Sequence, residues 1–168
     1  MDLNANGELL VSRHWPIPGN QLFDRLAYSL LDAQTGSENW GYEYELLDTM
    51  PFDGGVQTFS IAQHGNNESF FTAGRLRFSS PSIDDRHFII NITPSGQIIN
   101  SIIVDEPNML RVNSMVTHVD GSVYLLGRLK VNSWNEFGGA LLMQFDENLN
   151  LLWAKKLAAD QYLSLIHI

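Results

Sequence analysis

The sequence predicts an all-β fold built from repeats, because one stretch of the chain occurs twice. Residues 60–104 correspond to residues 114–157, and from Ser69 and Ser122 onward the two copies align without a gap at an offset of 53 residues. Identical residues are few, but apolar positions match apolar positions almost throughout. A fixed period of this size is typical of repeat architectures, in which each unit buries its faces against its neighbours. The repeat therefore constrains the fold more than the function.

Each repeat is expected to contain four short strands. Runs of aromatic and β-branched residues, bounded by Gly, Asn, Asp and Pro, predict strands, and neither repeat has a helical periodicity. The expected strands cover residues 58–64, 69–78, 87–93 and 97–104 in the first repeat and residues 111–118, 122–131, 140–145 and 149–157 in the second. Four antiparallel strands in roughly 50 residues are typical of a propeller blade. The chain is thus predicted to be a partial β-propeller of four-stranded antiparallel blades, with about three blades present.

The N-terminal third fits this period less well. Leu3–Leu10 resembles the last hairpin of a blade, and so does Leu30–Trp40, yet Gly7 and Gly36 are only 29 residues apart. Either the first blade is abbreviated, or residues from about 15 to 49 form an inserted hairpin. We expect residues 1–50 to form an incomplete or atypical blade with an inserted hairpin, residues 51–107 and 108–160 to form one blade each, and residues 161–168 to be a tail.

The chain is expected to be a fragment whose missing sequence supplies the rest of the propeller. A propeller ring closes with about 4–8 blades, more than this chain holds. Residues 163–168 either begin another innermost strand or are a translated sequencing adapter, so they need not be native.

Composition excludes several classes of function. With 44% hydrophobic and 17% charged residues, the chain is typical of a packed domain, and it has no run of about 20 apolar residues that would span a membrane. The absence of cysteine excludes disulfide and thiolate chemistry. The net charge of −9 disfavours nucleic acid and anionic membranes as partners. A basic segment followed by an apolar core, as in a signal peptide, does not occur at the N-terminus.

The second repeat resembles the β-propeller repeats of bacterial secreted and cell-surface proteins. The resemblance rests on an Asp-Gly turn, an aromatic residue, a glycine, a polar turn and a Trp-x-Lys motif, which are Asp120, Gly121, Tyr124, Gly127, Asp146, Trp153 and Lys155. The first repeat departs from this pattern at Asn67-Glu68 and at Asn100, which stands where the second repeat has Trp153. The resemblance implies a non-catalytic module for protein or glycan binding, or for scaffolding, that is extracellular or at the cell surface. The alternatives are the substrate-binding part of a larger propeller enzyme and a quinoprotein-like assembly factor.

A second motif lies in the N-terminal third. The segment Asp32–Trp40 resembles the D-x-x-T-G-x-x-x-W signature of quinoprotein-like propellers. In that family the tryptophan docks between adjacent blades, so the resemblance implies a structural role for Trp40. No cofactor is implied, because the adjacent cysteines of quinone dehydrogenases are absent from this chain.

Five residues are candidate ligand contacts. His64 and His118 occupy equivalent positions at the ends of the expected innermost strands, where they either face a ligand or hold neighbouring blades together. Arg75 and Arg128 also recur, and with Arg77 and Lys130 they form a basic stripe, because residues two apart share one face of a strand. Such a stripe is either solvated and salt-bridged or suited to an anionic ligand. Trp134, in an expected loop, is the best placed of the tryptophans for an exposed contact.

No catalytic, cofactor-binding or metal-binding residues are predicted. Asp2–Gly7 matches the first half of a calcium loop, but Arg13 stands where the bidentate glutamate is needed, so we interpret the segment as a turn. Serines, histidines and acidic residues show no nucleophile paired with a base. Five apolar residues are expected to be largely buried, because they hold equivalent or alternating positions in the two repeats: Ile89, Ile98, Leu142, Leu151 and Trp153.

Overall fold

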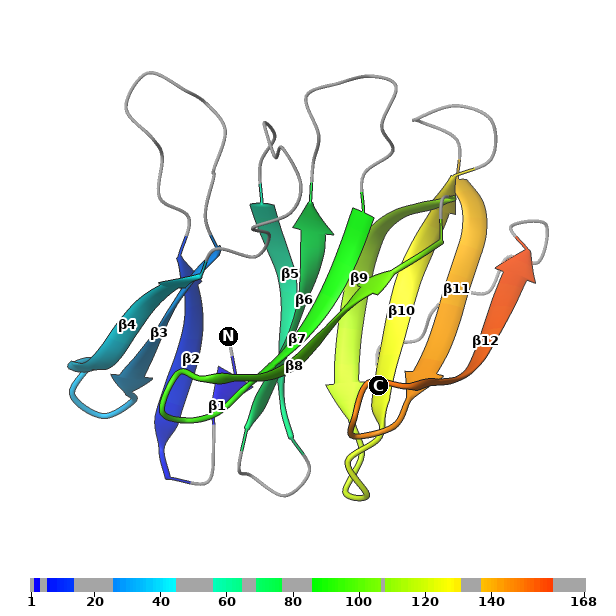
Figure 1. Ribbon diagram of the computed structural model, residues 1–168. Helices are drawn as coiled ribbons and strands as arrows, with labels where there is room; N and C mark the ends of the chain where they lie inside the picture. Colours follow the sequence, from blue (N-terminus) through cyan, green and yellow to red (C-terminus); the bar gives the residue numbers. More distant parts are fainter. Residues whose placement is uncertain are drawn as a thin grey trace, which may run out of the picture.

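The computed structural model shows three four-stranded antiparallel sheets standing side by side (Figure 1). It describes residues 2–3, 6–13, 26–44, 56–64, 69–76, 86–106, 108–130 and 137–158. All regular structure in these residues is β-strand, so the predicted all-β class is confirmed. No helix that is long and apolar enough to cross a membrane occurs in this described part of the chain.

Consecutive strands are neighbours in every sheet, so each sheet is a simple meander. The first sheet contains β1 (Asp2–Leu3), β2 (Glu8–Arg13), β3 (Leu26–Asp32) and β4 (Glu38–Tyr44). The second contains β5 (Val56–Gln63), β6 (Phe70–Leu76), β7 (Arg86–Ile92) and β8 (Ile98–Val104). The third contains β9 (Met109–Thr117), β10 (Val123–Lys130), β11 (Phe137–Phe145) and β12 (Leu151–Ala158).

The internal repeat corresponds to the second and third sheets, as predicted. Gly74 pairs with Phe88 across β6 and β7, and the equivalent Gly127 pairs with Leu141 across β10 and β11. A register shift also occurs at the same place in both sheets, between Thr58 and Ser60 on β5 and opposite Leu126 and Gly127 on β10. The repeat therefore extends from the sequence to the hydrogen-bonding ladder.

The last hairpin of all three sheets contains an irregularity at the same point. In the first sheet Leu30 pairs with Trp40, but the next residue on β3 pairs with Glu38. The same shift follows the Asn91–Asn100 pair in the second sheet and the Gln144–Trp153 pair in the third. An irregularity of this kind re-aims a side chain. Because the shift follows the same cross-strand pair in each sheet, three pairs are structurally equivalent: Leu30 with Trp40, Asn91 with Asn100, and Gln144 with Trp153.

The structure corrects the interpretation of the N-terminal third. Leu3–Leu10 is the first hairpin of its sheet and not a last hairpin, because β1 and β2 are joined at Gly7, the position of Gly121 in the third sheet. The pair β3 and β4, where an inserted hairpin was expected, is the outer half of the same sheet. The short distance between Gly7 and Gly36 arises because they lie in two turns of one sheet.

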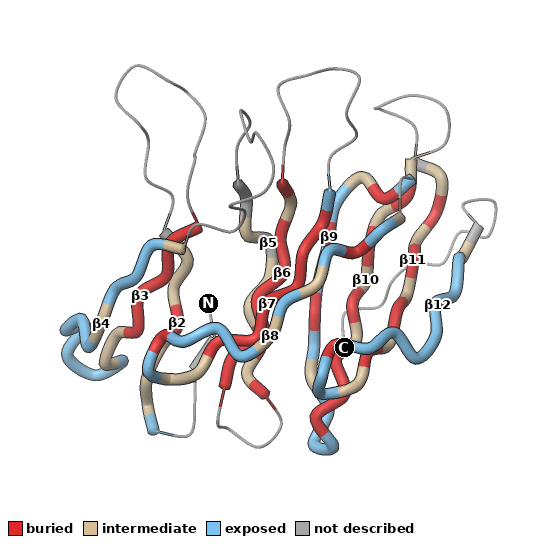
Figure 2. The backbone as a smooth tube through the Cα atoms, in the orientation of Figure 1, coloured by how far each residue is buried: buried red, intermediate tan, exposed pale blue. Residues whose placement is uncertain are grey.

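Apolar side chains fill the two spaces between the sheets. One core joins the first and second sheets and includes Tyr28, Phe70 and Phe88, and the other joins the second and third sheets and includes Phe71 and Leu125. Figure 2 shows that β6 and β7 in the middle sheet are buried almost throughout, whereas β4, β8 and β12 carry many exposed residues. The middle sheet is thus covered on both faces.

The expected burial is confirmed for one of the five residues. Ile89 is fully buried, but Leu142 is half-buried, and Ile98, Leu151 and Trp153 are exposed, with Leu151 at 52% and Trp153 at 39%. The reason is position: β8 and β12 are outermost strands, and no described strand lies against the second face of the third sheet.

Candidate functional site

The first and second sheets are docked through aromatic side chains of β4. The indole N–H of Trp40 donates a hydrogen bond to the carbonyl oxygen of Pro94, in the turn after β7 of the next sheet. The Tyr44 hydroxyl donates to the carbonyl oxygen of Gly96 in the same turn, at 2.5 Å. Gly96 has φ of 84°, and a Cβ atom there would lie 2.3 Å from a ring carbon of Tyr42. This turn therefore needs glycine both for its backbone conformation and for the close approach of Tyr42.

A buried tyrosine links the same two sheets closer to their inner strands. Tyr28 donates a hydrogen bond to Thr72 Oγ1 at 2.7 Å, and its hydroxyl lies 3.2 Å from Thr58 Oγ1. Burial raises the pKa of Tyr28 well above its ordinary value. The phenol therefore remains protonated and can keep donating across the seam.

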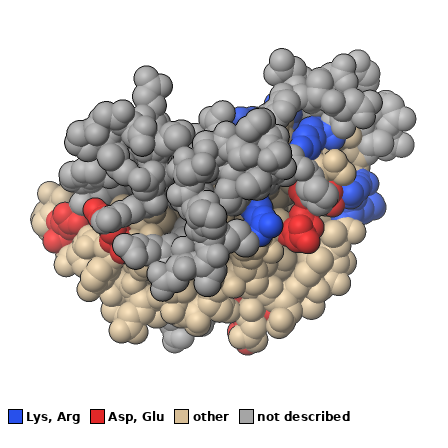
Figure 3. Space-filling model, turned by 45° about the horizontal axis from the view of Figure 1, so that its top comes forward, with Lys and Arg blue, Asp and Glu red and all other residues tan. Residues whose placement is uncertain are grey.

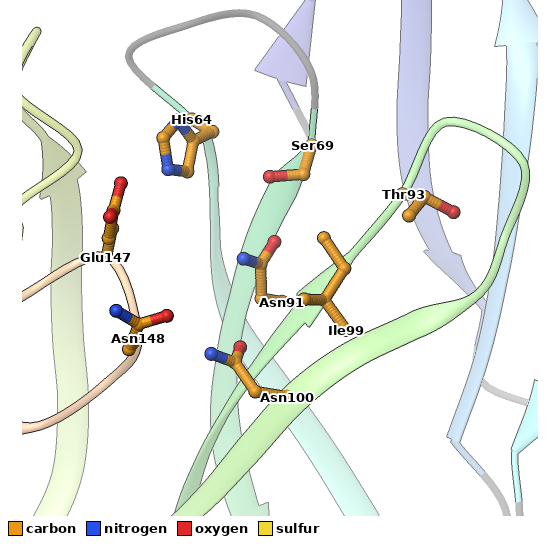
Figure 4. A pocket seen from close by; sticks show the side chains of 8 residues that line it. All are labelled: His64, Ser69, Asn91, Thr93, Ile99, Asn100, Glu147 and Asn148. Atoms are coloured by element: carbon orange, nitrogen blue, oxygen red, sulfur yellow. The ribbon is translucent and has the colours of Figure 1, made fainter.

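The seam between the second and third sheets is built differently at the equivalent place. Asn100 takes the position of Trp40, and Glu147 and Asn148 take the positions of Pro94 and Ser95. Where the first seam holds an indole ring, the second seam holds a cavity of about 310 Å³ (Figure 4). Its polar lining comes from the second sheet on one side and from the third sheet on the other: His64, Ser69, Asn91, Thr93 and Asn100, and Glu147 and Asn148.

Two asparagines form the wall of this cavity. Asn91 and Asn100 are cross-strand partners on β7 and β8, and Figure 4 shows both side chains directed toward the cavity, with Glu147 and Asn148 on its other side. Asn91 is only 4% exposed, and the Oδ1 atoms of both residues are buried without a hydrogen-bond partner. A buried acceptor left unpaired costs about 1–3 kcal/mol, so these two groups do not serve stability.

His64 closes one end of the cavity and contacts the next sheet. Its ring is buried, stacks on Phe71 with centroids 5.3 Å apart, and lies close to Gly121, where a Cβ atom would be 3.1 Å from the imidazole. Its backbone N–H donates to the Ser69 carbonyl at 2.8 Å, which closes the turn after β5.

His118 occupies the matching end of the third sheet but a different environment. Its backbone N–H donates to the Ser122 carbonyl at 2.8 Å, as His64 does to Ser69. Its side chain is 58% exposed and lies 3.0 Å from the Asp120 carboxylate. Hydrogen bonds from Ser122, and next from His118, lower the pKa of Asp120 to about 2. The structure thus places the two histidines at equivalent positions, in separate turns.

Arg75 and Arg128 are equivalent residues on β6 and β10, and both are half-buried. Arg75 lies near His87: burial lowers the pKa of His87 to about 4, and the positive charge of Arg75 lowers it further. Lys130, another member of the predicted basic stripe, is half-buried at the end of β10. Arg77 of the stripe and the predicted loop contact Trp134 lie outside the described residues.

Charged side chains are unevenly spread over the described surface. Figure 3 shows Lys and Arg in the upper and right-hand parts of the view, while the broad lower surface is almost free of charge. Among the described Lys and Arg residues, five belong to the third sheet: Arg111, Arg128, Lys130, Lys155 and Lys156.

Sequence reasoning missed the cavity residues Asn91 and Glu147. The departure at Asn100 from the tryptophan pattern was visible in the sequence, and it marks the cavity. Among the described residues, no three His, Asp or Glu side chains gather as a metal site would require. Asp146 instead caps its own turn, accepting hydrogen bonds from the backbone N–H groups of Asn148 at 3.0 Å and Asn150 at 2.7 Å.

Three meandering four-stranded sheets with repeated seams define a partial β-propeller. A search of solved structures finds a chain described as the structure of the Dos1 propeller, with a TM-score of 0.45 and 12% identity, covering 92% of this chain. The match spans 45% of that chain, which is less than half of its length. No protein-family model matches the sequence, and the comparison with curated proteins gives no match either.

Proposed function

We propose that the chain is a non-catalytic β-propeller repeat module of a bacterial protein, which binds a protein or glycan ligand and acts as a scaffold outside the cell or at its surface. The observation that carries this proposal is the difference between the two seams. One seam is closed by Trp40, whereas the other keeps a polar cavity with unpaired buried oxygens at Asn91 and Asn100. A buried polar group that is left unpaired calls for an explanation other than stability, and a ligand-binding role supplies one here.

The scaffolding part of the proposal is supported by the second face of the third sheet. Tyr124, Leu126 and Leu142 on this face are equivalents of Phe71, Ala73 and Ile89, through which the second sheet packs on the third. Trp153 also lies at the position of Trp40, but its indole N–H donates to Gln144 of its own sheet. The face thus has the residues for another seam, as a propeller module within a larger assembly requires.

The binding role can be tested on a glycan microarray and on a panel of purified candidate proteins, with the chain labelled at one introduced cysteine. Because the native chain has no cysteine, the label would occupy a single site. Saturable binding to one ligand class is expected, and the absence of any saturable ligand would contradict the proposed role.

The location can be tested separately by labelling intact cells of the source bacterium with an antibody against the chain. Accessible antigen on unpermeabilised cells or in the medium is expected. Antigen that is reached only after permeabilisation would contradict the surface or extracellular location and leave the binding role standing.

A further inference from the structure

We infer that the cavity between the second and third sheets is a binding site for one neutral saccharide unit. This inference rests on the proposed binding function and names its site and ligand class. It follows from what replaces the docking tryptophan, from the chemistry of the lining and from the size of the space.

The cavity lies where both residues of a repeated cross-strand pair are replaced. The equivalent cross-strand pairs are Leu30 with Trp40 in the first sheet and Gln144 with Trp153 in the third. In the second sheet both members are asparagines, so the bulky ring is absent and two carboxamides line the space. A change made only for packing would leave an apolar wall, whereas Asn91 and Asn100 leave buried Oδ1 atoms unpaired.

The lining selects for a ligand that both donates and accepts hydrogen bonds. The three carboxamides of Asn91, Asn100 and Asn148 each carry N–H donors and an oxygen acceptor, and Ser69 adds a hydroxyl group. A cation could use only the oxygen atoms, and an anion could use only the donors. A hydroxyl group can use both, which is the chemistry of a sugar.

Charge points to the same class. No Lys or Arg lines the cavity, and Glu147 is its one acidic lining residue, so an anionic ligand would meet a carboxylate and no permanent positive charge. The exposed Ile99 at the β8 irregularity adds an apolar surface beside the polar groups, as the mixed faces of a sugar ring require.

The size of the cavity fits a ring and not a single ion. Its volume of about 310 Å³ lies at the lower end of small-ligand pockets, which are about 300–1,000 Å³.

The test follows the side-chain amide signals of a ¹⁵N-labelled chain by NMR while single probes are added. The neutral probes are D-glucose, D-galactose, D-mannose and N-acetyl-D-glucosamine, and the charged probes are D-glucuronate and spermidine. At least one neutral sugar is expected to shift the amide signals of Asn91 and Asn100, with a dissociation constant of about 1 mM, as for a weak single-site ligand. Neither charged probe should do so.

Two variants remove the site without emptying the core. Asn91→Leu and Asn100→Trp introduce the residues that stand at these positions in the first sheet, so both should fold with an unchanged or higher Tm. Each should weaken binding of the sugar by at least about tenfold. Gln144→Leu, at the position of Asn91 in the third sheet, is the matched control and should bind as the native chain does.

Three results would overturn the inference: shifts confined to other residues, binding of spermidine or glucuronate in place of the sugars, or undiminished binding by the folded variants. Sugar binding elsewhere on the chain would refute this site and leave the proposed function standing. The complete absence of ligands on the microarray and among the candidate proteins would remove the proposed function itself.

Discussion

Leu149 holds in the third sheet the position that Gly96 holds in the second, and both have a left-handed backbone, with φ of 64° and 84°. Gly36, the equivalent residue of the first sheet, has φ of 70°. The turn between the third and fourth strands thus keeps one conformation in all three sheets. A left-handed residue with a side chain costs about 1–2 kcal/mol. At Leu149 the side chain is only 2% exposed in the core between the second and third sheets, and this burial offsets the cost.

Gly96→Ala should destabilise the chain more than Gly36→Ala. Both changes place a side chain at positive φ, which costs about 1–2 kcal/mol. At Gly96 the new methyl group would also overlap the Tyr42 ring, which adds about 1–3 kcal/mol, whereas nothing lies within 4 Å of the same atom at Gly36. Urea denaturation measures the loss of unfolding free energy in both variants. Equal losses would show that the Tyr42 ring does not pack closely against position 96.

Ile89→Ala should cost about 2–5 kcal/mol of unfolding free energy, because Ile89 is fully buried between the second and third sheets. Leu142→Ala, at the equivalent position of the third sheet, should cost less than about 2 kcal/mol because its side chain is half-buried. Chemical denaturation of both variants compares a covered face with an uncovered one. A similar cost for the two would mean that the second face of the third sheet is packed.

Stability should fall as the pH decreases from 6.5 to 4, because His87 takes up a proton more readily in the unfolded chain. Its pKa is about 4 when folded, against an ordinary 6.5, so the unfolded state binds more protons in this window. The free energy of unfolding carries its full contribution from neutral His87 above pH 6.5. Between pH 6.5 and pH 4, on the order of 2–3 kcal/mol of this contribution is lost.

His87→Gln should flatten the dependence of unfolding free energy on pH in that window. Asp120, whose pKa is lowered to about 2, adds a separate loss only as the pH falls below its ordinary value of 3.8. An unchanged slope between pH 6.5 and 4 in the variant would assign the dependence to other groups.

Strand positions followed closely from the sequence because turn residues and alternating apolar residues act locally. The strand expected over 122–131 is β10, Val123–Lys130, and the offset of 53 residues holds through β12. Burial was harder to predict. Leu151 and Trp153 have apolar side chains but lie on an outermost strand, and their exposure depends on neighbouring sheets that the local sequence does not encode.

The cavity could be predicted only in part, for the same reason. Asn100 stands where the second repeat has Trp153, and this difference marks the position of the cavity. Glu147 reaches the cavity from the turn of another sheet, so its role depends on how the two sheets stack.

Docking of Trp40 on the turn of the next sheet can be tested most directly by NMR of the indole N–H protons. The chain has four tryptophans, whose signals can be assigned with single Trp→Phe variants. The Trp40 N–H should show nuclear Overhauser contacts to protons of Pro94 and Gly96 and should exchange slowly with solvent. The Trp153 N–H, bonded within its own sheet and partly exposed, should exchange faster. Contacts from Trp40 to the first sheet alone, with exchange as fast as that of Trp153, would contradict the stacking of these sheets as successive blades.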